Sequence, residues 1–265
     1  IVRGSVLVYF SAYDLVAHWL LKPILKEQRA VFLQRSDLIE KTKLLLQHKN
    51  TLNFRLRLRV LELIYRKVAH VVDKIVVQTE HHERRLDKLG VRSKILVVTN
   101  NIKPSWVENK SARLVAFEAD DKRKVNFLIV ANLFYVIKGF DLLFDALKIV
   151  RKEIEYTFTI VGAGRDANRI QNQIERLGLG GNIKMVGAVK NAASIMKRFD
   201  AVVTPSPYDD CPNVLLEAIS ADLPILATDI DAHRFLLGPD FPLLEPTPKQ
   251  FSRTIEKFVE LGDEY

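Results

Sequence analysis

Two acidic residues beside the start of a helix carry the chemistry that this sequence points to. Asp209 lies in the polar loop PSPYDDCP, and Glu217 follows eight positions later in the segment NVLLEAIS. The loop comes after the apolar strand AVVTP and before that helix, where parallel sheets place ligand sites. Backbone N–H groups at Asn213, Val214 and Leu215 can then bind an anion. A sugar nucleotide fits this set, because its diphosphate suits the amides and its hydroxyls suit the carboxylates.

A lysine and a glycine turn extend the candidate site. Lys138-Gly139 follows the strand VNFLIVANL across a loop, and a lysine there can meet phosphate oxygens as a point charge. Gly162-Ala163-Gly164 follows the strand TFTIV, and with Ala167 it matches the G-x-G-x-x-A dinucleotide fingerprint. A nicotinamide site needs an acid at the end of the next strand, but NIKMVG has no carboxylate. We therefore interpret these glycines as a turn that lets the backbone approach a donor, and a nicotinamide oxidoreductase remains an alternative.

The stretch from Ala201 to Asp229 resembles the donor-site motif of the group 1 retaining glycosyltransferases, which have the GT-B fold. The family pattern is an acid, seven residues, Glu, then Ala and Gly-x-Pro. This sequence matches it at Asp209, Glu217, Ala218 and Asp222-Leu223-Pro224, and CPNVLLEA is the most specific part of the match. The first acid is Asp where the family usually has Glu, and Asp222 stands where Gly is usual.

The resemblance implies a role for each matching residue. The segment VANLFYVIKGFDLLFDAL resembles the family segment in which an Arg and a Lys hold the donor diphosphate; Lys138 matches the Lys, and Asn132 stands in place of the Arg. Asp209 is the predicted catalytic residue and binds the donor sugar. The predicted nucleotide-sugar-binding residues are Asn132, Lys138, Gly139, Gly162, Gly164, Val189, Asn213, Val214, Leu215 and Glu217. Val189 belongs to a loop beside the nucleotide base, and Glu217 binds the ribose.

No metal or further cofactor is expected, since the nucleotide-sugar is a co-substrate. Asp229-Ile230-Asp231 spells D-x-D, a metal-binding triplet of a different glycosyltransferase fold. Here it ends a strand in a doubly wound domain, and the resembling family works without an essential metal. We therefore predict a strand-end turn at this triplet.

Strands that alternate with helices predict an α/β protein of two Rossmann-like doubly wound domains. The predicted domains are residues 1–117, an acceptor-side domain with a linker, and residues 118–265, which bind the nucleotide-sugar. We expect the N-terminal domain to be incomplete, because the family's opening strands are missing. The pattern also predicts a helix over residues 13–27, a loop with helical pieces over 38–52, and a basic amphipathic helix over 54–72. His81 and His82 are expected to be exposed.

The charge of the chain is unevenly spread. Residues 1–100 hold 19 Lys and Arg against 9 Asp and Glu, although the net charge of all 265 residues is only +8. A basic first part can contact an anionic membrane or a lipid-phosphate acceptor, and a solvated basic surface is the alternative. The single Cys211 excludes an intramolecular disulfide and favours a reducing compartment. We therefore expect a cytoplasmic protein at the inner face of the membrane.

These observations predict an enzyme that moves a sugar from a UDP- or GDP-sugar to a glycan or lipid-linked acceptor, as in polysaccharide biosynthesis. No nucleic-acid partner is expected. The alternative is a catalytically weakened or inactive relative of the GT-B family that binds nucleotide or a partner protein. Asn132, Asp209 and the lack of a histidine after the strand AVFLQ favour that alternative.

Overall fold

The computed structural model describes residues 6–9, 16, 20, 29–34, 38–48, 51–68, 71–88, 90, 95–102 and 124–261. The chain divides into two compact units, Ile1–Asn100 and Asn101–Tyr265, and each is described by itself. The predicted domain boundary after residue 117 lies outside the described residues and stays a prediction. Among the described helices, none combines the length and the apolar character needed to cross a membrane.

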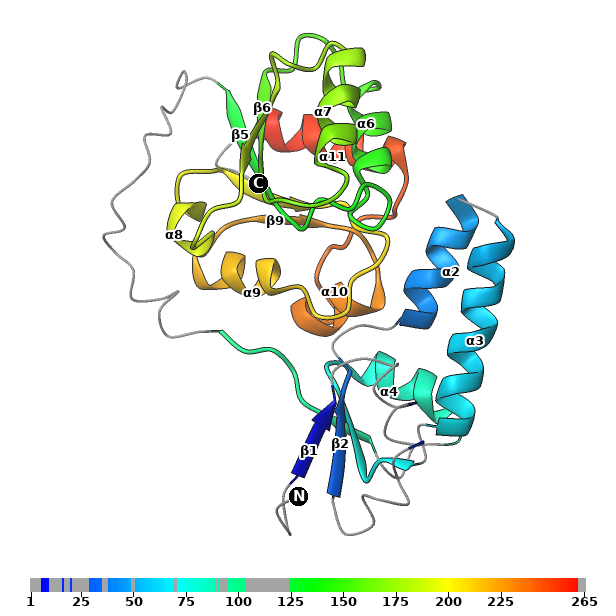
Figure 1. Ribbon diagram of the computed structural model, residues 1–265. Helices are drawn as coiled ribbons and strands as arrows, with labels where there is room; N and C mark the ends of the chain where they lie inside the picture. Colours follow the sequence, from blue (N-terminus) through cyan, green and yellow to red (C-terminus); the bar gives the residue numbers. More distant parts are fainter. Residues whose placement is uncertain are drawn as a thin grey trace. The chain divides into compact units, whose positions relative to one another are not determined.

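A four-stranded parallel sheet forms the first unit (Figure 1). Its strands lie side by side in chain order: β1 (Val6–Tyr9), β2 (Arg29–Leu33), β3 (Lys74–Val77) and β4 (Ile95–Val97). In β2 and β3 every second residue is buried, which is the pattern of strands with one face against a core. The strand AVFLQ that the sequence indicates is therefore found as β2.

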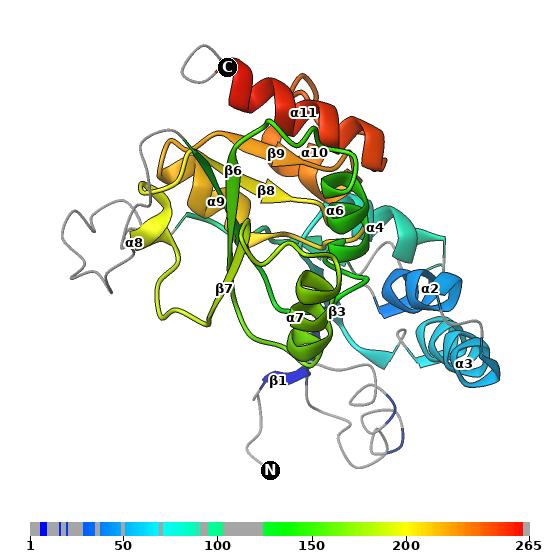
Figure 2. The ribbon, with the colours of Figure 1, turned by 90° about the horizontal axis from the view of Figure 1, so that it is seen from above.

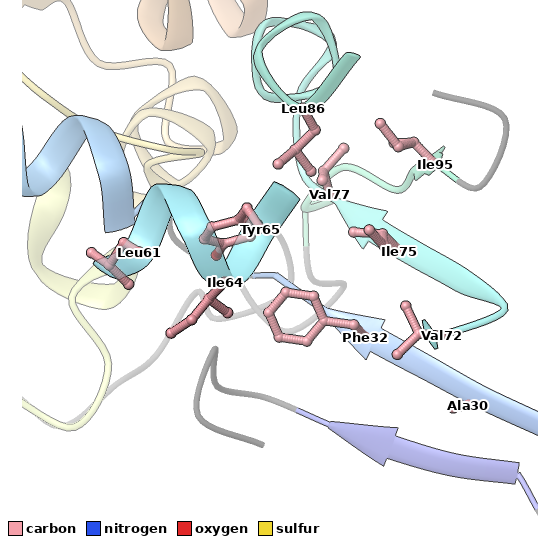
Figure 3. Packing of buried hydrophobic residues seen from close by; sticks show 10 residues of the cluster. All are labelled: Ala30, Phe32, Leu61, Ile64, Tyr65, Val72, Ile75, Val77, Leu86 and Ile95. Carbon is pink, nitrogen blue, oxygen red and sulfur yellow. The ribbon is translucent and has the colours of Figure 1, made fainter. Parts of the chain in front are cut away.

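The described residues of the first unit also form α2 (Leu38–His48), α3 (Leu52–Val68) and α4 (Glu80–Asp87). The core lies between α3, α4 and the sheet (Figure 3). Leu61, Ile64 and Tyr65 of α3 pack with Phe32 of β2 and with residues of β3. The helix predicted over residues 54–72 is thus found as α3, although it begins at Leu52 and ends at Val68, and its buried face holds it against the strands.

Two predictions for the first unit are wrong. Residues 38–48 form one regular helix rather than a loop with helical pieces, because α2 packs along α3 and this tertiary contact outweighs a mixed local pattern. His82 is buried rather than exposed: Gln34 Nε2 donates to His82 Nε2 at 2.7 Å. The helix predicted over residues 13–27 lies almost entirely outside the described residues.

The second unit is built on a five-stranded parallel sheet. Its strands are β5 (Val125–Val130), β6 (Tyr156–Val161), β7 (Ile183–Gly187), β8 (Ala201–Thr204) and β9 (Ile225–Ala227), in the order β7-β6-β5-β8-β9. Its helices are α6 (Phe140–Leu147), α7 (Ala167–Arg176), α8 (Ala193–Met196), α9 (Asn213–Ser220), α10 (Asp231–Leu237) and α11 (Pro248–Leu261). The predicted doubly wound α/β fold is confirmed.

Helices cover both faces of this sheet, with α6, α7 and α11 on one face and α8, α9 and α10 on the other (Figures 1 and 2). Successive residues of β5 show the two faces. Phe127 contacts Phe258 of α11, with ring centroids 5.5 Å apart, whereas Leu128 packs with Met196 and Ala218 from the side of α8 and α9. Apolar residues therefore occupy both layers, as a central parallel strand requires.

The strand order fixes where a ligand site can form. The chain runs from β5 outward to β6 and β7, then crosses back and continues through β8 and β9 on the other side of β5. The direction of winding therefore reverses between β5 and β8. In open parallel sheets, ligands bind in the crevice beyond the carboxyl ends of the two strands at such a reversal.

Candidate functional site

The loop after β8 brings Asp209 to the carboxyl edge of the sheet. Thr204 and Ser206 at its start are buried, and the loop ends where α9 begins at Asn213. Pro212 takes the cap position before the first helical turn. The backbone N–H of Leu215 donates to the carbonyl oxygen of Pro212 at 3.2 Å, so this amide bonds within the turn.

The loop after β5 brings Lys138 to the same edge. It ends at Gly139, which has a φ of 66° and opens α6. A Cβ atom on Gly139 would lie 2.0 Å from the carbonyl oxygen of Pro205, so a side chain here would collide with the loop after β8. Glycine thus permits both the left-handed conformation and the close approach of the two loops.

Lys138 and Asp209 form an ion pair across the gap between these loops. Lys138 Nζ lies 2.6 Å from Asp209 Oδ1, and the side chains are 18% and 11% exposed. Burial by itself raises the pKa of the Asp209 carboxyl, but the Lys138 ammonium and the His233 imidazole outweigh burial and lower this pKa from 3.8 to about 2. Asp209 is therefore a carboxylate at neutral pH, held beside a cation.

His233 is a part of this cluster that sequence reasoning missed. Its Nδ1 donates to the carbonyl oxygen of Thr228 at 2.9 Å, and its Nε2 faces Asp209 Oδ2 at 3.9 Å. The imidazole is fully buried, and neither Nε2 nor Oδ2 has a hydrogen-bond partner in the part of the chain that the structure describes. The imidazole therefore lies beside the carboxylate without a direct hydrogen bond between these two atoms, and a hydroxyl or water between them can satisfy both.

The glycine turn after β6 packs against the loop after β5. A Cβ atom on Gly162 would lie 1.8 Å from the carbonyl oxygen of Ala131, and one on Gly164 would lie 2.6 Å from backbone atoms of Leu133. The Leu133 N–H donates to the carbonyl oxygen of Ala163 at 3.0 Å. Both glycines are required by this contact between two backbones, whatever ligand the turn approaches.

The other predicted residues lie on neighbouring elements. Asn132 is exposed in the loop after β5. Val189, after β7, and Val214, in the first turn of α9, are half-buried and pack on one apolar cluster. Glu217 lies in the second turn of α9 and is half-buried.

Two further motifs have structural explanations. Asp222 has a φ of 54°, so it occupies the left-handed region where the family usually has Gly. In the D-x-D triplet, Asp229 forms an ion pair with Arg234, and Asp231 opens α10. The triplet thus forms the turn after β9 that the sequence predicted, and it continues into a helix that was not predicted.

Two parallel α/β units, with a charged pair at the reversal of the second sheet, define the class of protein, and solved structures agree. HepE of Anabaena, in complex with UDP-glucose, matches 97% of this chain and 70% of its own with a TM-score of 0.72 at 17% identity. Sucrose-phosphate synthase of Thermosynechococcus elongatus matches 96% of this chain and 64% of its own with a TM-score of 0.73 at 15% identity. The chain has the GT-B fold.

The model of the family "glycosyl transferases group 1" matches residues 112–265, and the chain belongs to this family. An uncharacterized glycosyltransferase of Methanocaldococcus jannaschii is 26% identical over 178 residues, which are 64% of this chain and 43% of that protein. The amylovoran biosynthesis glycosyltransferase AmsD of Erwinia amylovora is 28% identical over 159 residues, which are 60% of this chain and 44% of that protein. The chain spans less than half the length of these curated relatives.

Proposed function

We propose that this protein transfers a sugar from a nucleotide-diphosphate sugar to a glycan or lipid-linked acceptor and retains the anomeric configuration. The observation that carries the proposal is the Lys138–Asp209 ion pair at the reversal point of the second sheet, in a chain of the group 1 family. A nucleotide-sugar donor needs both groups: the cation binds the diphosphate, and the buried carboxylate binds the hydroxyls of the sugar.

In the proposed donor complex, the diphosphate takes over Lys138 as its cation, together with the backbone amides at Asn213 and Val214. Asp209 then accepts hydrogen bonds from hydroxyls of the donor sugar, and Glu217 binds the hydroxyls of the ribose. The Leu215 amide plays a smaller part than the sequence indicated, because it already bonds to Pro212. The nucleotide lies between the turn at Gly162 and Gly164 and the loop at Val189. Asn132 offers an uncharged hydrogen-bonding group beside the diphosphate.

In the proposed reaction, one bond at the anomeric carbon breaks and another forms. The bond to the diphosphate oxygen breaks, and the acceptor hydroxyl oxygen bonds to the same face of the sugar. The hydroxyl proton passes to the departing phosphate. Negative charge develops on the leaving nucleotide, and Lys138 stabilises it where water is largely excluded.

The relatives indicate a polysaccharide or lipid acceptor. The names of similar proteins include a capsular polysaccharide biosynthesis glycosyltransferase of Staphylococcus aureus and a phosphatidyl-myo-inositol mannosyltransferase of Mycobacterium tuberculosis. Together with the basic balance of residues 1–100, they favour a cytoplasmic enzyme that works at the anionic inner face of a membrane.

Release of free nucleotide tests the proposal. The full-length protein is incubated with UDP- and GDP-sugars and an extract of lipid acceptors, and steady release of UDP or GDP is expected. Asp209→Asn should lower the rate at least about tenfold, since it removes the charge facing the donor. Asp229→Asn changes an acid outside this cluster and should leave the rate unchanged. Binding of the donor without release would support the inactive relative, and loss in both variants alike would contradict the role of Asp209.

A further inference from the structure

Helix α3 has apolar residues on two opposite faces. The first face carries Leu61, Ile64 and Tyr65, which are buried against the first sheet (Figure 3). The second face carries Leu52, Leu56, Val60 and Leu63, which are 80%, 60%, 43% and 58% exposed. The amphipathic pattern of α3 thus explains its inner face and leaves a second apolar row in solvent.

The exposed residues form one continuous stripe. They follow each other at intervals of four, four and three positions, so they stand one above the other on the same side of the helix. At a rise of 1.5 Å per residue, the stripe is about 16 Å long. Single exposed leucines are ordinary, but an aligned row of four large apolar side chains is typical of an interaction surface.

Basic residues border this stripe. The sequence of α3 contains five basic residues and one acidic residue, Glu62, and all five basic side chains are exposed: Arg55, Arg57, Arg59, Arg66 and Lys67. At 100° per residue, Arg55, Arg59 and Arg66 lie along one side of the stripe, Lys67 continues the line of the stripe beyond Leu63, and Arg57 lies toward the inner face. The surface therefore combines a leucine row with positive charge along one edge and at its C-terminal end.

We propose that this leucine stripe binds α3 to an anionic lipid surface, with the helix axis in the plane of the membrane. The leucines enter the acyl boundary, and the flanking guanidinium groups meet lipid phosphates. Nucleic acid also attracts arginines, but it offers leucine side chains no apolar partner. The stripe supplies a defined site for the membrane contact that is proposed above. The contact does not depend on the transfer reaction, so either proposal can fail while the other stands.

Co-sedimentation of the full chain with vesicles tests the inference. The protein should sediment with vesicles of phosphatidylcholine and phosphatidylglycerol at low salt, and it should stay in solution with phosphatidylcholine alone. Leu56→Ser combined with Leu63→Ser should lower the partition coefficient at least about tenfold, because two apolar side chains no longer leave water. Ile149→Ser is the matched control in the second unit, where Ile149 is 52% exposed, and it should bind as the wild type does.

Three results would overturn the inference. The first is a wild-type protein that does not sediment with the anionic vesicles, and the second is a double variant that binds them unchanged. The third is a concentration-dependent oligomer that the leucine substitutions dissociate, since the stripe would then be covered by a second copy of the chain. Circular dichroism of both variants checks that they are folded, as expected for substitutions of exposed residues.

Discussion

Lys138 Nζ and Asp209 Oδ1 lie 2.6 Å apart, although the two residues are 71 positions apart in the sequence and follow different strands. The ion pair depends on the close approach of the loops after β5 and β8, which Gly139 permits. It holds a carboxylate and a cation at the edge of the sheet. In the donor complex proposed above, the diphosphate would compete with Asp209 for the same ammonium group, and donor binding would then be coupled to release of the carboxylate.

The ion pair should contribute to stability as a unit. Lys138→Met leaves the Asp209 carboxylate buried without its cation and should lower the free energy of unfolding by about 3 kcal/mol. Asp209→Asn added to Lys138→Met should restore most of this loss, because no buried charge remains. Urea unfolding of the wild type, both single variants and the double variant gives the coupling energy. Additive effects of the two substitutions would show that the pair is not formed in solution.

The lowered pKa of Asp209 predicts a stability that depends on acid pH. The carboxyl titrates at about 2 in the folded protein and near 3.8 when unfolded, so its ionisation stabilises the fold above pH 4. That contribution, about 2 kcal/mol, is lost as the pH falls from 4 towards 2. The difference in unfolding free energy between the wild type and Asp209→Asn should therefore be constant above pH 5 and shrink below pH 4. A difference that does not change with pH would contradict this account.

His233 should act on Asp209 rather than only fill space. In His233→Asn the amide nitrogen can still donate to the Thr228 carbonyl, while the nitrogen that faces Asp209 is gone. The pKa of Asp209 should therefore rise, measured by a carbon-13 NMR titration of its carboxyl. Thr228→Val is the control, because it removes a hydroxyl and keeps that carbonyl. If the pKa of Asp209 is the same in His233→Asn and the wild type, His233 has no electrostatic part in the site.

Asp222 should be replaceable by Gly with a gain in stability. Its φ of 54° costs an ordinary L-residue about 1 kcal/mol or more, and glycine avoids that cost. Asp222→Gly should raise the unfolding free energy by about 0.5 kcal/mol after the larger entropy of an unfolded glycine is subtracted. Asp222→Ala should lower it, since the left-handed conformation is tolerated better by Asp than by Ala. Thermal unfolding of the wild type, Asp222→Gly and Asp222→Ala measures their relative stabilities. A Gly variant that is less stable than the wild type would contradict the prediction.

Much of the second unit could be predicted from sequence, because its strands and helices alternate and clear turn signals separate them. The predicted elements on either side of Asp209 and Lys138 are found as β8, α9, β5 and α6. Their loops meet because the strands are parallel neighbours, which follows from the expected fold.

The misses came from tertiary contacts. The sequence predicted only helical pieces within a loop where α2 lies, because α2 packs on α3 and no local pattern shows this contact. His233 was overlooked because no spacing rule links α10 to the loop after β8; the two meet only after β9 is placed. The aspartate triplet before it gave the one available signal, a turn at a strand end, which also marks the carboxyl edge of the sheet.

Calorimetric titration with UDP- and GDP-sugars tests the central claim most directly, because it measures the donor site without an acceptor. We predict that the wild type binds one of them with a stoichiometry of one. Lys138→Met and Glu217→Ala should each weaken binding at least about tenfold, and Glu175→Ala on the exposed face of α7 should bind as the wild type does. Absence of binding to every nucleotide sugar, or equal affinity in Lys138→Met and the wild type, would contradict a donor site at this edge of the sheet.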